Sequence, residues 1–283
     1  MAIHKFGGDW TQKKLDIVKD YLTEYTRIFE HNENARYFRR WYVDAFAGTG
    51  TRIDSATDND SKEYLKGSAR MSLDVEPSFH SFLFIEQDAN KAKELENLKL
   101  EYPKKADSII IVQGDANEVL KDWISKMDWN KERAVVFLDP YGMQVDWETI
   151  RLIAFTKGID LWLLFPFSLL NRLLTNDGIP PQDWCDKLTR IFGTDEWIEQ
   201  FYTKVEDDTL FGIEESIIKS VHMSYLKEFI VKRLQTVFFA VAPNPLELVN
   251  SRNSPLYLLC FAAGNEKGSK PAIKIASHLL KKI

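Results

Sequence analysis

The sequence feature that most constrains the fold is a short apolar run that breaks into glycines, Tyr42-Val43-Asp44-Ala45-Phe46-Ala47-Gly48-Thr49-Gly50-Thr51. The apolar and aromatic residues up to Phe46, interrupted by one carboxylate, are typical of a buried parallel strand. The Gly-Thr-Gly turn lacks Cβ atoms at two positions, so the backbone can turn sharply and approach a ligand closely. A strand that ends in such a turn favours a ligand site at the carboxyl edge of an open α/β sheet. A tight connection alone gives the same pattern.

The rest of the chain repeats the alternation of strand and helix. Apolar segments predict five strands, at residues 41–46, 81–85, 108–113, 134–138 and 159–165. Helices are predicted between them, and right-handed crossovers then bring all five carboxyl ends to one rim. Two more strands, at 237–241 and 256–263, suit an antiparallel pair at the sheet edge. The sequence therefore predicts one α/β domain over residues 1–283, with a doubly wound, mostly parallel seven-stranded sheet and an antiparallel edge strand.

Several segments are predicted to pack around this sheet. Residues 9–31 are expected to form a helix that covers one sheet face, because their apolar side chains recur at helical spacing. Ser68 is expected to cap the helix that runs to Asp74. Residues 168–212 are rich in aromatic side chains and are predicted to be a helical insertion or lid. Further helices are predicted at 90–100, 214–234 and 271–280.

Composition limits the classes of function. The chain has 283 residues, a net charge of −5 and a pI of about 5.7, so no global basic field attracts nucleic acid or an anionic membrane. A nucleic-acid substrate would need a local basic patch, and Arg36 to Arg40 is the best one in the first half. Cys185 and Cys260 make no disulfide or metal framework. No apolar run reaches about 18 residues, so we expect a cytoplasmic protein without a membrane span or a metal site.

Four predicted strand ends carry polar residues. These are Asp44 with its glycines, then Glu86, then Asp115, then Asp139-Pro140-Tyr141. A carboxylate after the second strand is placed to accept both hydroxyls of a ribose, and one after the third can accept an adenine amino group. Each carboxylate alone is more often a loop residue or helix cap. Together they predict an adenosine-shaped slot beside the glycine turn.

The slot fits S-adenosylmethionine better than a nicotinamide dinucleotide. Thr51-Arg52-Ile53 follows the turn, so the third glycine of a pyrophosphate fingerprint is missing. The P-loop pattern with its Gly-Lys-Ser/Thr is missing as well. Residues 52–66 are polar and are interpreted as an exposed loop over the site.

These motifs resemble those of class I S-adenosylmethionine-dependent methyltransferases. Asp44-x-Phe46-x-Gly48-x-Gly50 is similar to the first motif in the form found among enzymes that modify amino groups, Glu86 to the second, Gly114-Asp115-Ala116 to the third and Asp139-Pro140-Tyr141-Gly142 to the fourth. The resemblance implies a cofactor-binding set of Asp44, Phe46, Gly48, Thr49, Gly50, Glu86, Asp115 and Ala116. It implies Asp139, Pro140 and Tyr141 as catalytic residues.

Over nearly its full length the chain resembles the three-Cys-motif partner protein (TcmP) family. Trp10 with the Lys14-Leu15 helix, the segments 42–50 and 138–142, Gly67-Ser68 and the segment 255–263 carry the resemblance. It implies a methyltransferase-like protein that works with a separate three-cysteine-motif protein, itself similar to radical-S-adenosylmethionine enzymes.

The fourth motif departs from the amino-methyltransferase pattern. Those enzymes show Asp/Asn-Pro-Pro-Tyr/Phe, and this chain is one proline short, closer to the Asp-Pro-Phe-Gly of tRNA guanine N2-methyltransferases. Guanine, adenine and a non-nucleobase amine therefore stay open as methyl acceptors. Phe165-Pro166-Phe167 can add an aromatic wall or simply pack in the core.

Three functions remain after this reasoning. The first is methyl transfer to an amine, with Asp139 and the Pro140 carbonyl accepting its N–H groups and Tyr141 stacking on an extruded base. The second is a methyltransferase-like cofactor-binding or structural subunit without its own activity. The third is a nucleotide-binding oxidoreductase.

Overall fold

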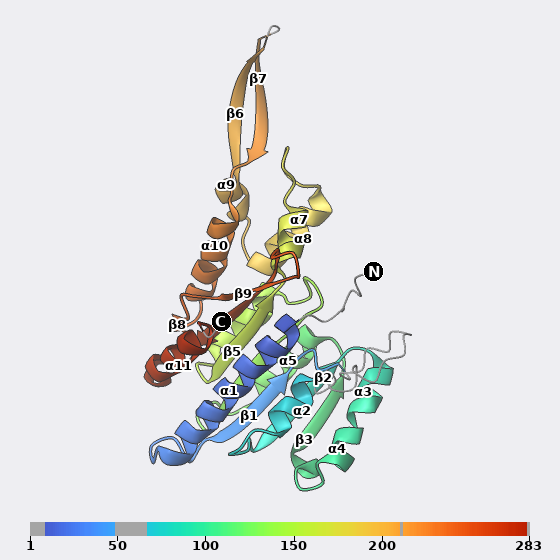
Figure 1. The fold of residues 1–283 in the computed structure, drawn as a ribbon, viewed down its shortest axis with the longest axis vertical. Coiled ribbons are helices and arrows are strands. Elements are labelled where there is room, and N and C mark those ends of the chain that lie inside the picture. The colour runs from blue at the N-terminus through green and yellow to red at the C-terminus, as the bar shows by residue number, and fades with distance from the viewer. Residues whose placement is uncertain (1–8, 49–66, 210–211, 282–283) are drawn as a thin grey trace.

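A computed structural model describes residues 9–48, 67–209 and 212–281 (Figure 1). The helices are α1 (Asp9–His31), α2 (Ser68–Leu73), α3 (Ala89–Leu95), α4 (Asn97–Glu101), α5 (Ala116–Lys126), α6 (Trp147–Phe155), α7 (Phe167–Leu173), α8 (Gln182–Phe192), α9 (Trp197–Phe201), α10 (Met223–Gln235) and α11 (Glu266–Leu279). The strands are β1 (Arg39–Asp44), β2 (Ser81–Glu86), β3 (Ile109–Gln113), β4 (Glu132–Leu138), β5 (Ile159–Phe165), β6 (Tyr202–Thr209), β7 (Gly212–Lys219), β8 (Ala240–Val241), β9 (Leu246–Val249) and β10 (Pro255–Ala263).

The main sheet has the order β3-β2-β1-β4-β5-β10-β8, with β9 also paired to β10. The first five strands are parallel, which confirms the five predicted strands and the doubly wound α/β class. The sheet nevertheless contains eight strands in the described chain rather than seven. The predicted antiparallel pair at the sheet edge is confirmed, since β10 pairs antiparallel with β8, the last strand of the order. β10 itself is paired on both sides, with β5 on one side and with β8 and β9 on the other.

Two apolar cores sandwich this sheet. β5 is buried along its whole length, as expected for a strand covered on both faces. On one face α1, α2 and α11 pack against side chains such as Tyr42 and Phe84. On the other face α5, α6 and α10 pack against Val43 and Leu163. The residues of α1 with helical spacing turn inward, and Val18 and Leu22 are fully buried.

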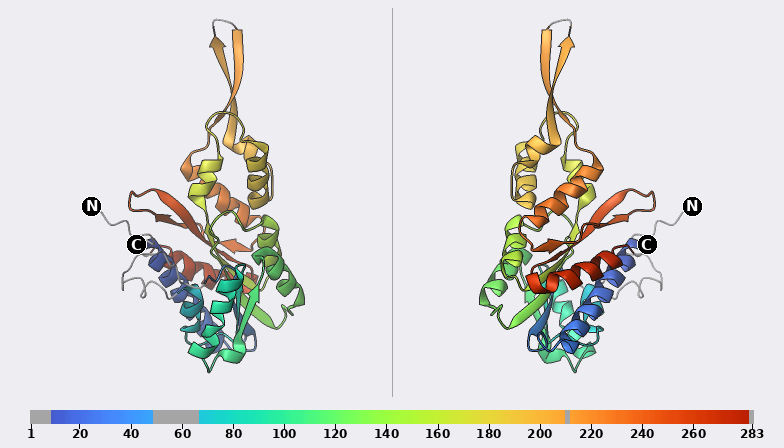
Figure 2. Two further views of the ribbon diagram at one scale, coloured as in Figure 1. Left: turned by 90° about the vertical axis from the view of Figure 1, so that its right-hand side faces the viewer. Right: turned by 90° about the vertical axis from the view of Figure 1, so that its left-hand side faces the viewer.

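The prediction for residues 214–234 is wrong in its first part. Residues 212–219 form strand β7, and the helix α10 begins only at Met223. β7 pairs antiparallel with β6 along eight register positions, so the two strands make a separate hairpin that projects from the body (Figures 1 and 2). The helix prediction failed for residues 214–219 because isoleucines at 213, 217 and 218 suit a strand as well as a helix. Pairing with β6 decides between the two.

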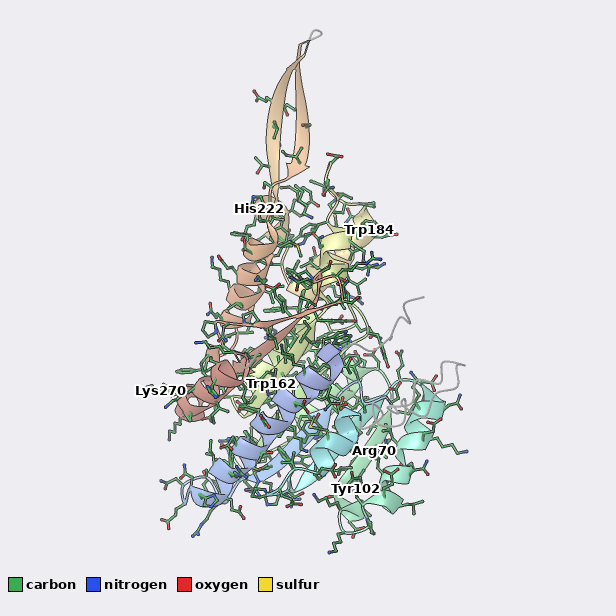
Figure 3. The ribbon with its side chains drawn as sticks, in the orientation of Figure 1. Arg70, Tyr102, Trp162, Trp184, His222 and Lys270 are labelled. Carbon is green, nitrogen blue, oxygen red and sulfur yellow. The ribbon has the colours of Figure 1, made fainter. Side chains whose placement is uncertain are left out.

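The segment 168–212 is helical only as far as Phe201, where β6 begins. Its aromatic side chains mostly pack with α10 in the core on the α5 side of the sheet. Phe192 and Phe201 lie edge-on to Phe229, with ring centroids 5.0 Å and 4.8 Å apart. Trp197 is fully buried, whereas Trp184 is half-buried at the surface of α8 (Figure 3). These buried rings anchor helices α7 to α10, which we call the helical lobe, to the sheet. They leave little aromatic surface for a partner.

Smaller differences concern helix ends. The helix predicted over 90–100 is divided at Glu96 into α3 and α4. The last helix begins at Glu266 rather than Pro271, capped by Asn265, whose side chain accepts the Gly268 N–H. The capping position of α2 belongs to Gly67, so Ser68 is not the cap.

Within residues 9–48, 67–209 and 212–281, no helix combines the length and the apolar character needed to cross a bilayer. The same residues contain no cluster of three or more His, Cys, Asp or Glu side chains suited to a metal ion.

Candidate active site

The sheet order brings the predicted site residues to one rim. β1 lies between β2 and β4, and Asp44 is in register with Phe84 and Phe137. Glu86 and Asp139 therefore end or follow the strands on either side of Asp44. Asp115 follows β3, the next strand beyond β2.

Asp44 is the most deeply buried carboxylate of the rim. Its side chain is fully inaccessible, its Oδ1 accepts the Phe46 N–H at 3.2 Å, and its Oδ2 has no hydrogen-bond partner among the described residues. Burial raises the pKa of Asp44 to about 7, and the nearby Asp139 carboxylate adds to the rise, while the Ser68 hydroxyl and Lys14 lower it. A buried oxygen without a partner costs free energy unless a ligand supplies a donor.

Asp139 is paired with a residue that the sequence motifs did not place in the site. Lys14 of α1 forms an ion pair with the Asp139 carboxylate, and only 7% of the lysine side chain is exposed. The Lys14 ammonium also lies 5.4 Å from the Trp10 ring centroid. A lysine on the otherwise apolar face of a covering helix was the one available signal for this contact.

Glu86 connects the second strand to the glycine turn. Its Oε2 accepts the Gly48 N–H and its Oε1 accepts the Asp88 N–H, both at 2.9 Å. Two backbone bonds leave acceptor capacity on a carboxylate, which offers about four lone-pair sites. Gly48 is buried with φ of +52°, a left-handed conformation that favours glycine. Thr49, Gly50 and the loop 52–66 lie outside the described residues.

Asp115 is a helix cap, the more common role of a single carboxylate at such a position. Its Oδ1 accepts the N–H groups of Asn117 and Glu118 and begins α5, while the side chain itself is exposed. Ala116, the first residue of α5, is buried. Phe46 is half-buried and packs against the core on the α5 side.

Asn117, which sequence reasoning passed over, fixes the loop after β4. Its Oδ1 accepts from the Asp146 N–H at 3.0 Å and from the Thr149 hydroxyl at 2.7 Å, and its Nδ2 donates to the Gln144 carbonyl at 2.9 Å. The loop that carries the fourth motif is thereby held to the third motif. A single Asn after Gly-Asp-Ala gave no pattern that predicts this.

The two residues after Asp139 differ in exposure. Pro140 is buried, whereas Tyr141 is 61% exposed, with the Lys91 ammonium 5.5 Å from its ring centroid. An exposed ring at the rim presents a face on which a planar group can stack. Phe165 and Phe167, by contrast, are buried in the core and do not form a second wall.

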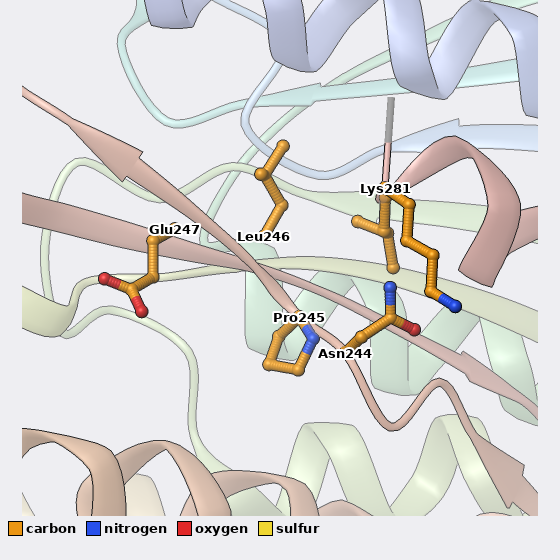
Figure 4. Close-up of a pocket in the computed structure, with 6 residues that line it drawn as sticks. Asn244, Pro245, Leu246, Glu247 and Lys281 are labelled. Carbon is orange, nitrogen blue, oxygen red and sulfur yellow. The ribbon is translucent and has the colours of Figure 1, made fainter. Parts of the chain in front are cut away.

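A shallow hollow elsewhere on the molecule does not belong to this site. It is lined by Asn244, Pro245, Leu246, Glu247, Leu280 and Lys281 (Figure 4). These residues lie beside β8 and β9, at the edge of the sheet opposite β3.

Comparisons with known proteins leave the family open. No family model matches the chain, and no curated protein matches it. Among solved structures, it is similar to protein LPL1258 from Legionella pneumophila (14% identity, TM-score 0.36, covering 79% of this chain and 92% of that one). It is also similar to the glycopeptide N-methyltransferase MtfA in complex with S-adenosylhomocysteine (11%, 0.33, 87% and 89%). A third is the methyltransferase domain of bacterial CtHen1-C (11%, 0.36, 88% and 99%).

The fold class rests on the strand order, because likenesses this remote carry no argument by themselves. Five parallel strands in the order 3-2-1-4-5, followed by one antiparallel strand and a short strand beyond it, make a Rossmann-like sheet of the class I methyltransferase type. A fold of this type does not by itself fix a reaction.

Proposed function

We propose that the chain is an S-adenosylmethionine-dependent methyltransferase that acts on an amino nitrogen of a nucleobase. The observation that carries the proposal is the charge of the rim. The described strand ends hold the carboxylates of Asp44, Glu86, Asp115 and Asp139 against the ammonium groups of Lys14 and Lys91. A site with excess carboxylate attracts a ligand that carries a sulfonium and an ammonium, and it repels the pyrophosphate of a dinucleotide.

The chain's own residues fit this cofactor. The partnerless Oδ2 of Asp44 offers an acceptor for a cationic donor, and the spare lone pairs of Glu86 offer acceptors for ribose hydroxyls. Gly48 leaves room where a Cβ would otherwise stand. When bound, S-adenosylmethionine supplies an electrophilic methyl group on its sulfonium sulfur.

The remaining residues act on the methyl acceptor. An exocyclic amine is a poor nucleophile, because its lone pair is delocalised into the ring. Asp139 and the Pro140 carbonyl accept one N–H each, which favours a pyramidal nitrogen and stabilises the developing positive charge. Tyr141 stacks on the base, an interaction worth about 1–3 kcal/mol. Lys14 holds the Asp139 carboxylate in place. Alignment of the acceptor nitrogen with the methyl group, to which Asp139 contributes, can in total lower a barrier by about 7–11 kcal/mol.

Calorimetry tests the cofactor. We expect S-adenosylmethionine and S-adenosylhomocysteine to bind and NAD not to bind. Glu86→Gln should weaken the cofactor by about 1.5–3 kcal/mol, the worth of a hydrogen bond to a charged group. Asp88→Asn, which changes a neighbouring helix cap, is the matched control. NAD binding without S-adenosylmethionine binding would overturn the assignment.

Transfer of tritiated methyl groups into RNA, DNA and protein tests the reaction. Asp139→Asn should reduce incorporation far more than it reduces cofactor affinity, because the interaction is made chiefly in the transition state. Asp139→Ala alone would leave Lys14 buried without its partner, so Lys14→Met/Asp139→Ala is the better deletion. Cofactor binding without incorporation into any pool would favour a cofactor-binding subunit instead.

We propose further that the chain works with a three-cysteine-motif protein. This proposal rests on the resemblance of Trp10, Lys14 and the segments 42–50, 138–142 and 255–263 to the TcmP family. The acidic net charge of −5 supports it, because a partner can supply the surface that holds a nucleic-acid substrate. Co-expression with such a protein followed by pull-down is the test, and failure to form a complex would remove the partner from the proposal.

A further inference from the structure

The β6–β7 hairpin is anchored only at its base. The Gly178 N–H donates to the Ile217 carbonyl at 2.7 Å, and the Lys219 N–H donates to the Asn176 carbonyl at 2.9 Å. From Val205 and Ser216 toward the tip, the described residues form no hydrogen bond with the body of the protein. Figures 1 and 2 show the ribbon projecting well beyond the helices around it.

The acidic residues of the hairpin do not stabilise it. An isolated two-stranded ribbon is at best marginally stable in water, and cross-strand pairs are its main source of stability. Here Glu206 lies directly opposite Glu215, and both are exposed. Like charges at opposite positions destabilise a ribbon, so these residues weaken the element that carries them.

The hairpin projects from the same end of the sheet as the candidate active site. Its base is attached to α7, which follows the carboxyl end of β5, since the Lys219 ammonium donates to Asn171 Oδ1 at 2.8 Å. β5 neighbours β4, whose carboxyl end leads into Asp139. The base of the ribbon and the candidate site thus lie at the same end of the sheet.

We propose that the hairpin strands β6 and β7, residues 202–209 and 212–219, dock on a basic surface of a partner protein. The two strands contain five acidic residues and two lysines, so their net charge is negative, and the described Glu206 and Glu215 are exposed. Electrostatic complementarity then selects a basic face and repels the phosphates of a nucleic acid. Two copies pairing through their ribbons would bring like charges together, which disfavours that arrangement, and we assign the docking surface to a different protein. The inference rests on the partner part of the proposed function and not on methyl transfer.

The experiment uses the full chain with a photo-crosslinking amino acid at Val205, or separately at Ser216, in cells of the source organism. The cross-linked protein is identified, purified and titrated by calorimetry at low and high salt. Glu206→Lys/Glu215→Lys keeps a like-charged pair in the ribbon, so the cross-strand repulsion is matched while the charge is reversed. Glu206→Lys alone makes an attractive pair and a more stable ribbon, which separates stability from charge. Glu199→Lys/Glu228→Lys changes two exposed residues of the helical lobe by the same charge.

We expect a cross-link to one protein through a segment rich in Lys or Arg. The double reversal should weaken its binding at least about tenfold, and the single reversal should weaken it less, because charge pairs at an interface each contribute. The Glu199→Lys/Glu228→Lys control should keep the wild-type affinity. Exchange of the partner's cross-linked basic residues for Glu should restore binding to the Glu206→Lys/Glu215→Lys chain.

Three results would overturn the inference: cross-links to nucleic acid or to a second copy of the chain, no cross-link from either position, or unchanged affinity in Glu206→Lys/Glu215→Lys. The readout does not depend on methyl transfer. Loss of methyl transfer with intact partner binding would contradict the proposed reaction but not the docking inference.

Discussion

The ionisation of Asp44 is strongly coupled to folding in the neutral pH range. Its pKa rises from an ordinary value of 3.8 to about 7 because the carboxylate is buried. The folded protein therefore binds this proton more tightly than the unfolded chain does. Its contribution to stability is complete below pH 4 and is lost as the pH rises through 7.

Asp44→Asn should remove this dependence. Without ligand, the variant should gain stability relative to wild type as the pH rises from 5 to 8, because an amide has no charge to desolvate. Urea unfolding at both pH values measures the difference, and Asp16→Asn, at an exposed position of α1, is the control. An equal difference at pH 5 and pH 8 would show that the burial of Asp44 does not raise its pKa.

Lys14 and Asp139 should behave as a pair. Removal of one partner from a buried ion pair costs about 3–5 kcal/mol, because the remaining charge is left without compensation. Lys14→Met should therefore be strongly destabilising, while Lys14→Met/Asp139→Leu should recover part of the loss, since replacement of both charges can be nearly neutral. A double-mutant cycle in urea measures the coupling. Additive losses would mean that the pair does not contribute as a unit.

At the scale of elements, Asn117 joins the start of α5 to the loop after β4. Asn117→Ala removes the acceptor for the Asp146 N–H and the Thr149 hydroxyl, at a cost of about 1–3 kcal/mol. Asn117→Asp keeps that acceptor and loses only the bond to the Gln144 carbonyl, so its cost should be smaller. Hydrogen exchange at the Asp146 amide reports the loop directly. Unchanged protection in Asn117→Ala would remove Asn117 from this role.

The end of α8 depends on Gly193. Its φ is +66°, and a Cβ built there would lie 1.9 Å from Trp147 Cδ1. Gly193→Ala should cost about 1–2 kcal/mol for the left-handed backbone and about 1–3 kcal/mol more for overpacking. Gly178 has φ of +74° but no atom within 4 Å of the added Cβ, so Gly178→Ala carries only the backbone cost. Equal losses of unfolding free energy in the two variants would contradict the clash with Trp147.

At the scale of the whole molecule, cofactor binding should appear as stability. A ligand that binds only the folded state at 100 times its Kd adds about 2.7 kcal/mol, which is a rise in Tm of about 4–5 °C for a chain of this size. We expect this rise with S-adenosylmethionine and none with NAD. Asp44→Asn should reduce it, because the buried acceptor for the cation loses its charge. A full rise in that variant would place the cation elsewhere.

The sequence by itself determined the five parallel strands and the rim on which the polar residues stand. Each strand is a short apolar run bounded by turn residues, and the crossovers allow only one edge for their carboxyl ends. The sequence alone therefore assigns Asp44, Glu86 and Asp139 to one edge of the sheet. Periodicity failed for residues 212–219, where the same isoleucines suit a helix or a strand and only the pairing with 202–209 decides.

Tertiary structure alone decided what the polar residues contact. Lys14 and Asp139 are 125 residues apart, and nothing local marks the lysine as buried or as the partner of that carboxylate. The state of Asp44 likewise depends on α1 and α2 closing over β1, because desolvation is a property of surroundings and not of a motif. Asn117 binds the loop after β4 only because α5 and α6 pack side by side. Strands follow from local patterns, whereas charge, burial and pairing follow from contacts between distant segments.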